Sequence, residues 1–210
     1  MKKIRLKKNL KEKSRKWLSR QFSDNFYKNA KKDHLRSRSA YKLIEIHEKF
    51  KIFFPGSKTL DLGAAPGGWS IVAQKYSQPN GKVIGVDKLK INPFKGINFL
   101  LGDLTDLKTV GIIEKNIVEK IDILISDMSP NTVGHRKTDH LRIIVLAEIA
   151  FEFAMRFLKK DGFFICKLFQ GGGVENLIIE IKKNFYLKKL FKPLASRKES
   201  SEIYLVAKKK

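Results

Sequence analysis

The chain has 210 residues, of which 42% are hydrophobic, and this fits one domain with a sizeable core and an extension. Its formal net charge of +23 favours a polyanionic partner, and we expect nucleic acid rather than an anionic membrane surface. One cysteine and four histidines argue against a disulfide or a structural zinc site, and neither a membrane-spanning apolar run nor a secretion signal is present.

Residues 1–37 form a basic extension that we expect to be only partly ordered. Residues 1–38 hold 15 Lys and Arg against 3 acids, interleaved with Leu, Trp, Phe and Tyr. Aromatic rings can stack on bases while basic side chains contact phosphates, although a merely solvated arm would look the same. A basic N-terminus also imitates an organellar transit peptide, and the sequence leaves that open; we expect a reducing, cytoplasmic location.

The remaining residues, 38–210, are predicted to form one α/β domain. Ser37 or Ser39 can cap a first helix, and Pro55-Gly56 ends that unit. Strands are then predicted at 58–64, 81–87, 97–103, 122–127 and 162–170, helices at 67–77, 107–120, 141–160 and 174–185, and a final hairpin from 186–193 and 201–209. Apolar strands joined by crossover helices imply a mostly parallel sheet with helices on both faces.

The segment LDLGAAPGGWS, residues 60–70, ends a strand in a glycine-rich turn and opens a helix. Gly63, Gly67 and Gly68 let the backbone approach a ligand closely, at the nucleotide-binding position of a doubly wound sheet. Their spacing departs from G-x-G-x-x-G, and Pro66 removes an N–H group that a pyrophosphate needs. The turn therefore favours a nucleoside cofactor without phosphates over NAD.

Two acids close the next two strands at the same edge of the predicted sheet. Asp87 ends GKVIGVD, 20 residues after Gly67, where an acid commonly binds ribose hydroxyls. Asp103 ends INFLLGD, where it can accept a hydrogen bond from an adenine amino group. Strand-end aspartates often cap turns, but consecutive strand–helix units that each end in an acid favour a cofactor site.

Charged residues also lie in or beside the apolar strands that follow. Asp127 comes directly after ILIS, Lys167 interrupts FFICKLF, and Glu202 opens the last strand. A charged lysine in a buried strand is costly unless it is paired, so these groups are expected to meet; a buried ion pair that only fixes the fold is the alternative. Cys166 should point to the opposite face of its strand and belong to the core.

Six segments, in this order and spacing, resemble the FtsJ-like ribosomal RNA ribose 2′-O-methyltransferases: LDLGAAPGGWS, GVD, GDLTD, DILISDMSPN, CKLFQGGG and SRKESSEIYLVA. The resemblance implies a Rossmann-like S-adenosylmethionine methyltransferase fold with a seven-stranded sheet. It also implies a catalytic Lys-Asp-Lys-Glu tetrad at Lys42, Asp127, Lys167 and Glu202. The cofactor contacts that it implies are Gly67, Trp69, Asp87, Asp103 and Asp127.

A ribose hydroxyl is a poor nucleophile and must lose its proton as the methyl group moves, so positioning and proton removal are the main tasks. Lys167 is the expected proton acceptor. The neighbouring acids Asp127 and Glu202 favour its charged form, whereas Lys42 opposes it. A charged Lys167 that orients the hydroxyl and stabilises developing negative charge therefore stays an alternative.

The resemblance is strongest to the compact bacterial form, which implies methylation of a uridine of 23S ribosomal RNA in the assembled 50S particle. We expect a monomer without a metal site. Methylation of transfer RNA ribose or of the messenger RNA cap is the close alternative. A non-catalytic RNA-binding ribosome assembly factor is the alternative of a different class. Base methyltransferases and NAD-dependent oxidoreductases fit less well, because DMSP replaces the Asn/Asp-Pro-Pro motif and because Pro66 disfavours NAD.

Overall fold

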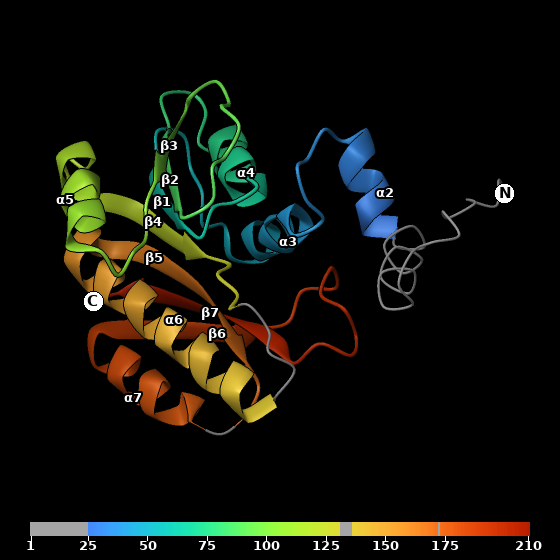
Figure 1. The fold of residues 1–210 in the computed structure, drawn as a ribbon, viewed down its shortest axis with the longest axis vertical. Helices are drawn as coiled ribbons and strands as arrows, with labels where there is room; N and C mark the ends of the chain where they lie inside the picture. The colour runs from blue at the N-terminus through green and yellow to red at the C-terminus, as the bar shows by residue number, and fades with distance from the viewer. Residues whose placement is uncertain (1–24, 131–135, 172) are drawn as a thin grey trace, which may run out of the picture.

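The computed structural model describes residues 25–130, 136–171 and 173–210, which form a sheet between two layers of helices (Figure 1). The strands are β1 (Lys58–Leu62), β2 (Lys82–Asp87), β3 (Ile97–Leu101), β4 (Ile121–Ser126), β5 (Leu158–Phe169), β6 (Phe185–Phe191) and β7 (Glu202–Lys209). The helices are α2 (Asn25–Lys32), α3 (Ala40–Phe50), α4 (Gly68–Tyr76), α5 (Leu107–Asn116), α6 (Arg136–Phe157) and α7 (Val174–Asn184).

The sheet has seven strands in the order β3-β2-β1-β4-β5-β7-β6. All neighbouring pairs from β3 to β5 are parallel, whereas β7 is antiparallel to both β5 and β6. The predicted α/β fold with a mostly parallel seven-stranded sheet is thus confirmed, including the final hairpin. Every residue of β4 is buried, as expected for a central strand that is covered on both faces.

Two apolar clusters hold the helices on the sheet. On one face, α5, α6 and α7 pack through side chains such as Ile113, Ala147 and Leu177. On the other face, α3 and α4 pack through side chains such as Leu43 and Val72. Strands β1 and β4 are neighbours, but the chain continues from β1 to β2 on one side and from β4 to β5 on the other. Because these connections diverge, a crevice is expected at the carboxyl ends of β1 and β4, where such folds bind ligands.

The structure differs from the predicted elements at several ends. The helix predicted at 141–160 begins at Arg136 and ends at Phe157, because Leu158 already pairs with Ile121 of β4. Helix α5 ends at Asn116 instead of residue 120, and α2 was not predicted. Ser39 occupies the N-cap position of α3, but its hydroxyl bonds to the Ser37 hydroxyl and not to the helix.

Most of the predicted basic extension, residues 1–24, lies outside the described part of the chain. Its described end is packed against the body: Ala30 of α2 is buried, and the ring of Phe26 lies 5.5 Å from that of Tyr41 on α3. None of the helices in the described ranges combines the length and the apolar character that are needed to cross a bilayer.

Candidate active site

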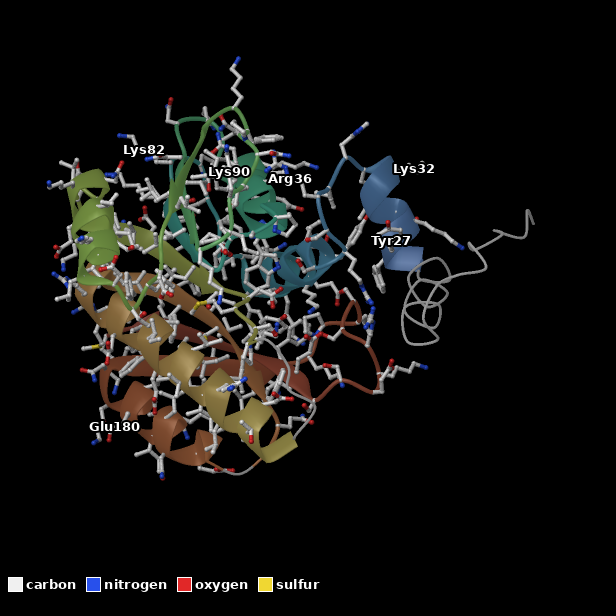
Figure 2. The ribbon with its side chains drawn as sticks, in the orientation of Figure 1. Tyr27, Lys32, Arg36, Lys82, Lys90 and Glu180 are labelled. Atoms are coloured by element: carbon white, nitrogen blue, oxygen red, sulfur yellow. The ribbon has the colours of Figure 1, made fainter. Side chains whose placement is uncertain are left out.

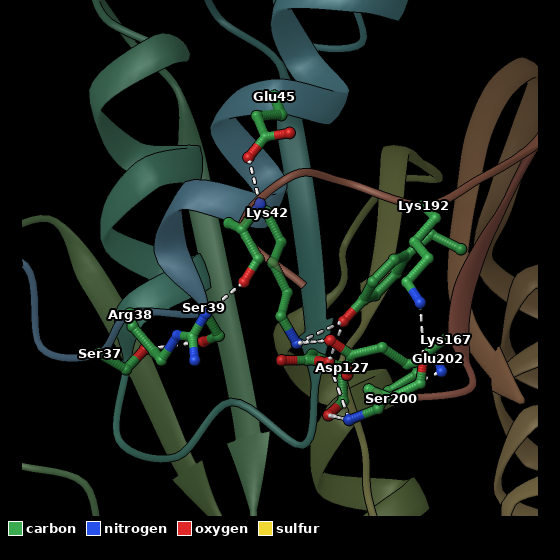
Figure 3. A network of polar contacts seen from close by, with 12 residues as sticks. Ser37, Arg38, Ser39, Lys42, Glu45, Asp127, Lys167, Lys192, Ser200 and Glu202 are labelled. Atoms are coloured by element: carbon green, nitrogen blue, oxygen red, sulfur yellow. Dashed lines mark hydrogen bonds and ion pairs between the residues drawn. The ribbon is translucent and has the colours of Figure 1, made fainter. Parts of the chain in front are cut away.

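Two buried lysines meet two acids where α3, β5, β7 and the end of β4 come together (Figure 3). Lys42 Nζ lies 2.8 Å from Glu202 Oε1, and Lys167 Nζ lies 3.1 Å from Asp127 Oδ1. Lys42, Lys167 and Glu202 are only 7–8% exposed. The structure therefore brings together the four residues that were predicted as a tetrad, although 160 residues of chain separate the first from the last.

The register of the last strands explains this arrangement. Lys167 of β5 lies directly opposite Tyr204 of β7, and Glu202 precedes Tyr204 by two residues, so all three side chains lie on one face of the sheet. Cys166 points to the other face, where it is buried in the apolar cluster around α6, as predicted. Burial raises the pKa of its thiol to about 12, which fits a residue of the core.

Tyr204 connects the two ion pairs, and the sequence did not predict a role for it in the site. Its hydroxyl donates to Asp127 Oδ1 at 2.7 Å and accepts from Lys42 Nζ at 3.1 Å. The side chain is fully buried, and its ring lies 5.5 Å from that of Trp69. The tyrosine lies in SEIYLVA, a mostly apolar strand in which a buried aromatic residue is ordinary. No local signal therefore distinguishes it from a core residue.

The charges in this network stabilise one another. Burial by itself raises the pKa of Asp127, but Lys167, Lys42 and the hydrogen bond from Tyr204 together hold it below its usual value. Asp127 is therefore ionised at neutral pH. Burial, together with the nearby charges of Asp127 and Glu202, raises the pKa of Tyr204 well above its usual value, so its hydroxyl stays protonated and can act as a donor.

The glycine-rich turn that follows β1 is hydrogen-bonded to the carboxyl end of β2, through the Val86 carbonyl oxygen and the Asp87 side chain. Gly63 and Gly67 have φ angles of 75° and 103°, which side-chain-bearing residues rarely adopt. A Cβ atom at Gly63 would lie 2.4 Å from Met128 Cγ, and one at Gly68 would lie 2.3 Å from Ser37 Oγ. The turn is therefore closely packed on its neighbours and has a fixed shape.

Arg36, which is labelled in Figure 2, is hydrogen-bonded to this turn. Its guanidinium donates to the carbonyl oxygens of Pro66, Asn92 and Pro93 at 3.2, 2.7 and 2.9 Å, and it lies within 6 Å of the ring centres of Phe94 and Phe99. The sequence suggested only a basic side chain for phosphates. In the structure Arg36 links the turn to the β2–β3 connection.

The predicted cofactor acids Asp87 and Asp103 follow neighbouring strands. Asp87 accepts hydrogen bonds from the N–H groups of Ala65 and Leu89 at 2.9 and 2.8 Å, so it also fixes the turn. Asp103 is exposed and accepts both the N–H and the hydroxyl of Thr105, and these bonds lower its pKa. Both residues thus have the capping role that was considered, and their remaining lone pairs can still accept from a ligand.

Asp61 of β1 is a further acid at this edge, which the sequence places at the end of a strand but which was not predicted as a cofactor contact. It is 1% exposed, it accepts from Ser70 Oγ at 2.6 Å, and its Oδ1 has no hydrogen-bond partner. Burial raises its pKa to about 7; the Ser70 hydroxyl lowers it, and the charges of Asp127 and Asp87 add to the rise.

These acids agree with the cofactor that was expected. Asp61, Asp87, Asp103 and Asp127 lie at the carboxyl ends of β1 to β4, in a chain that is otherwise strongly basic. S-adenosylmethionine carries a sulfonium and an ammonium group, so this local excess of carboxylates suits it. Trp69, at the start of α4, is buried and donates from Nε1 to Ser39 O at 2.8 Å, and its ring packs on that of Tyr204. Within the described ranges no group of three His, Cys, Asp or Glu side chains is placed to hold a metal ion.

Comparison with known proteins decides the family. Residues 35–210 match the model of the FtsJ-like methyltransferases, which is most of the chain. The chain belongs to the FtsJ-like methyltransferase family. Membership of this family implies a methyl donor, and the Lys-Asp-Lys-Glu cluster lies within the matched residues.

Curated relatives of this FtsJ-like chain are named ribosomal RNA large subunit methyltransferase E. Those of Rickettsia africae and Rickettsia akari are 48% and 49% identical over 196 residues, which is 91% of this chain and 86% of each relative. A solved ribosomal RNA methyltransferase from Plasmodium falciparum has a TM-score of 0.71 and 29% identity, over 83% of this chain and 97% of that one. The fibrillarin/Nop5p complex, with a TM-score of 0.53 and 18% identity over 74% of this chain and 73% of that one, shares the fold alone.

Proposed function

We propose that this protein methylates the 2′-hydroxyl of a uridine ribose in 23S ribosomal RNA, in the assembled 50S particle, with S-adenosylmethionine as methyl donor. The observation that carries the proposal is the buried Lys167–Asp127 pair, joined to Lys42 and Glu202 beside the glycine-rich turn. The names of the curated relatives and the net charge of +23 support ribosomal RNA as the substrate.

Each site residue has a role in this proposal. S-adenosylmethionine supplies, when bound, a methyl group on a positively charged sulfur. The residues that would hold it are Gly63, Gly67, Gly68, Trp69, Asp87, Asp103 and Asp127, with Asp87 on the ribose hydroxyls and Asp103 on the adenine amino group. Lys167 accepts the proton of the RNA hydroxyl, Asp127 holds Lys167 in place, and Lys42 and Glu202 complete the tetrad.

The charge of the protein matches a large anionic partner. Basic side chains project from separate parts of the described chain, including Lys32 on α2, Lys82 on β2 and Lys90 in the β2–β3 connection (Figure 2). The region 1–37 adds further positive charge, and we propose that it binds the RNA of the 50S particle. The methyltransferase domain is proposed to begin near residue 38. We propose that the protein acts as a cytoplasmic monomer.

The test is transfer of labelled methyl from S-adenosylmethionine to unmodified 50S particles, with the label mapped to base or ribose. Wild type should label ribose, and Lys167→Ala should lower the rate by about 10²- to 10⁴-fold, because the proton acceptor is lost. Lys183→Ala, which truncates an exposed lysine of α7, is the matched control and should leave the rate unchanged. Label on a base, or full activity of Lys167→Ala, contradicts the proposal.

The same assay separates the alternative functions. Activity on 50S particles should exceed activity on a protein-free 23S transcript, and equal rates would count against the assembled particle as substrate. Label on transfer RNA, without label on either ribosomal substrate, would identify a transfer RNA ribose methyltransferase. Cofactor binding without transfer to any RNA would favour a non-catalytic assembly factor.

A further inference from the structure

The hydroxyl of Tyr204 and the ammonium of Lys167 approach the same oxygen atom. Tyr204 Oη lies 2.7 Å from Asp127 Oδ1, and Lys167 Nζ lies 3.1 Å from it. Lys167 also approaches the Asp127 carbonyl oxygen at 3.4 Å. The shorter of the two contacts to Oδ1 is therefore the one that the tyrosine makes, and the two donors share one carboxylate oxygen.

We propose that Tyr204 is a positioning residue that limits how strongly Asp127 holds the proton on Lys167. The inference rests on the proposed methylation of ribose, in which Lys167 must accept a proton. A hydrogen bond from a neutral hydroxyl withdraws negative charge from Asp127 Oδ1 and weakens its attraction for the ammonium. Without this bond the full charge of Asp127 acts on Lys167 and holds the ammonium more strongly.

The geometry gives the hydroxyl a fixed direction. Lys42 Nζ donates to the Tyr204 oxygen at 3.1 Å, so the hydroxyl proton is left to point at Asp127. Lys42 itself is held by Glu202 at 2.8 Å. The ring is fully buried against Trp69, which leaves it little freedom to turn away. Glu202 thus acts on Lys167 through Lys42 and Tyr204.

Charged and titratable groups from every neighbouring element take part in this balance. They are Lys42 on α3, Asp61 on β1, Asp127 after β4, Cys166 and Lys167 on β5, and Glu202 on β7. Helix α4 contributes Trp69, which does not titrate. The Tyr204 hydroxyl joins the Lys42–Glu202 pair to the Lys167–Asp127 pair, so removing it changes the link between the pairs while all six titratable groups stay in place.

The test compares Tyr204→Phe with wild type in methyl transfer to 50S particles as a function of pH. The variant removes one oxygen atom and should lower kcat by about tenfold or more. The pH at which the rate reaches half of its plateau should rise by roughly 0.5 to 1 unit, while KM for S-adenosylmethionine stays unchanged. Tyr76→Phe, a half-buried tyrosine of α4 outside the site, is the matched control and should change neither value.

A lower kcat with an unshifted pH midpoint would overturn the inference. The hydroxyl would then act only through packing or through its hydrogen bond with Lys42. If Tyr204→Phe fails to fold, 3-fluorotyrosine at position 204 decides the question. It keeps the ring and the hydroxyl but is a stronger donor, so the midpoint should move to lower pH. No movement, or movement to higher pH, would refute the role of Tyr204.

A measurement without RNA keeps this inference separate from the proposed function. Wild type that does not methylate 50S particles would refute the function alone. The titration of Lys167 can still be followed by NMR in protein with ¹³Cε-labelled lysine, with the signal assigned by its loss in Lys167→Met. Its midpoint should be higher in Tyr204→Phe than in wild type, and equal midpoints would refute the inference.

Discussion

Asp61 shows how a single buried carboxyl makes stability depend on pH. Its pKa is about 7 in the folded protein, because burial disfavours its charge. Between about pH 4 and pH 7 the folded state keeps a proton that the unfolded chain has lost. The free energy of unfolding should therefore fall as pH rises through this window, by up to about 4 kcal/mol from this group, and should stay at the lower value above pH 7.

Asp61→Asn removes this titration. Urea unfolding of the cofactor-free protein at pH 4.5 and at pH 8 should show a smaller decrease in the free energy of unfolding for the variant than for wild type. Glu199→Gln, at an exposed position in the β6–β7 connection, should behave like wild type. An equal decrease in Asp61→Asn and wild type would mean that Asp61 is ionised in the folded protein throughout this range.

At the scale of elements, α3 anchors the connection between β6 and β7. Glu45 of α3 accepts hydrogen bonds from the N–H groups of Leu194 and Ala195 at 2.5 and 2.8 Å, and Arg38 donates to the Ala195 carbonyl oxygen at 2.5 Å (Figure 3 shows Glu45 and Arg38). This connection leads directly into Glu202. Helix α3 therefore holds both ends of the Lys42–Glu202 pair.

Glu45→Ala should loosen this connection. Amide hydrogen exchange at Leu194 and Ala195 should become about tenfold faster or more, because two bonds to a charged acceptor are lost. The rate of methyl transfer should fall while affinity for S-adenosylmethionine is kept. Glu48→Ala, an exposed residue of the same helix, is the control and should alter neither. Unchanged exchange in Glu45→Ala would show that the anchor lies elsewhere.

The sequence predicted these elements well where one local rule decides the structure. Apolar runs marked the buried strands, and the buried charge of Lys167 predicted the pairing with Asp127 that the structure contains. The prediction failed where partners distant in the chain decide. Leu158 joins β5 only because Ile121 pairs with it, and α2 is a short helix in which five of the eight residues are Asn or Lys. Tyr204 meets Lys42 and Asp127 from 162 and 77 residues away, which a strand pattern does not encode.

At the scale of the whole molecule, positive charge dominates. Residues 1–24 hold ten Lys and Arg and two acids, whereas 25–32 form α2, which packs on α3. Deleting 1–24 should weaken binding to 50S particles and make the slope of log K against log salt shallower, because fewer counterions are released. Affinity for S-adenosylmethionine should stay nearly the same.

Deleting 1–32 should have the additional effect of lowering stability, because Ala30 and the ring contact of Phe26 with Tyr41 are lost. Comparing the two deletions by titration at several salt concentrations and by thermal unfolding separates charge from packing. Loss of cofactor binding on deletion of 1–24 would show that this segment is part of the fold.

The position of β7 between β5 and β6 has a consequence for how the chain folds. Lys42 and Asp127 precede the final hairpin, and they find their partners Glu202 and Tyr204 only when β7 has paired with β5. A partly folded chain that closed its core before then would bury Lys42 without Glu202, at a cost of several kcal/mol. Asp127 would keep Lys167 as its partner but would lack the hydrogen bond from Tyr204. We therefore expect such intermediates to be poorly populated, and we expect the same buried charges to favour folding in one cooperative step.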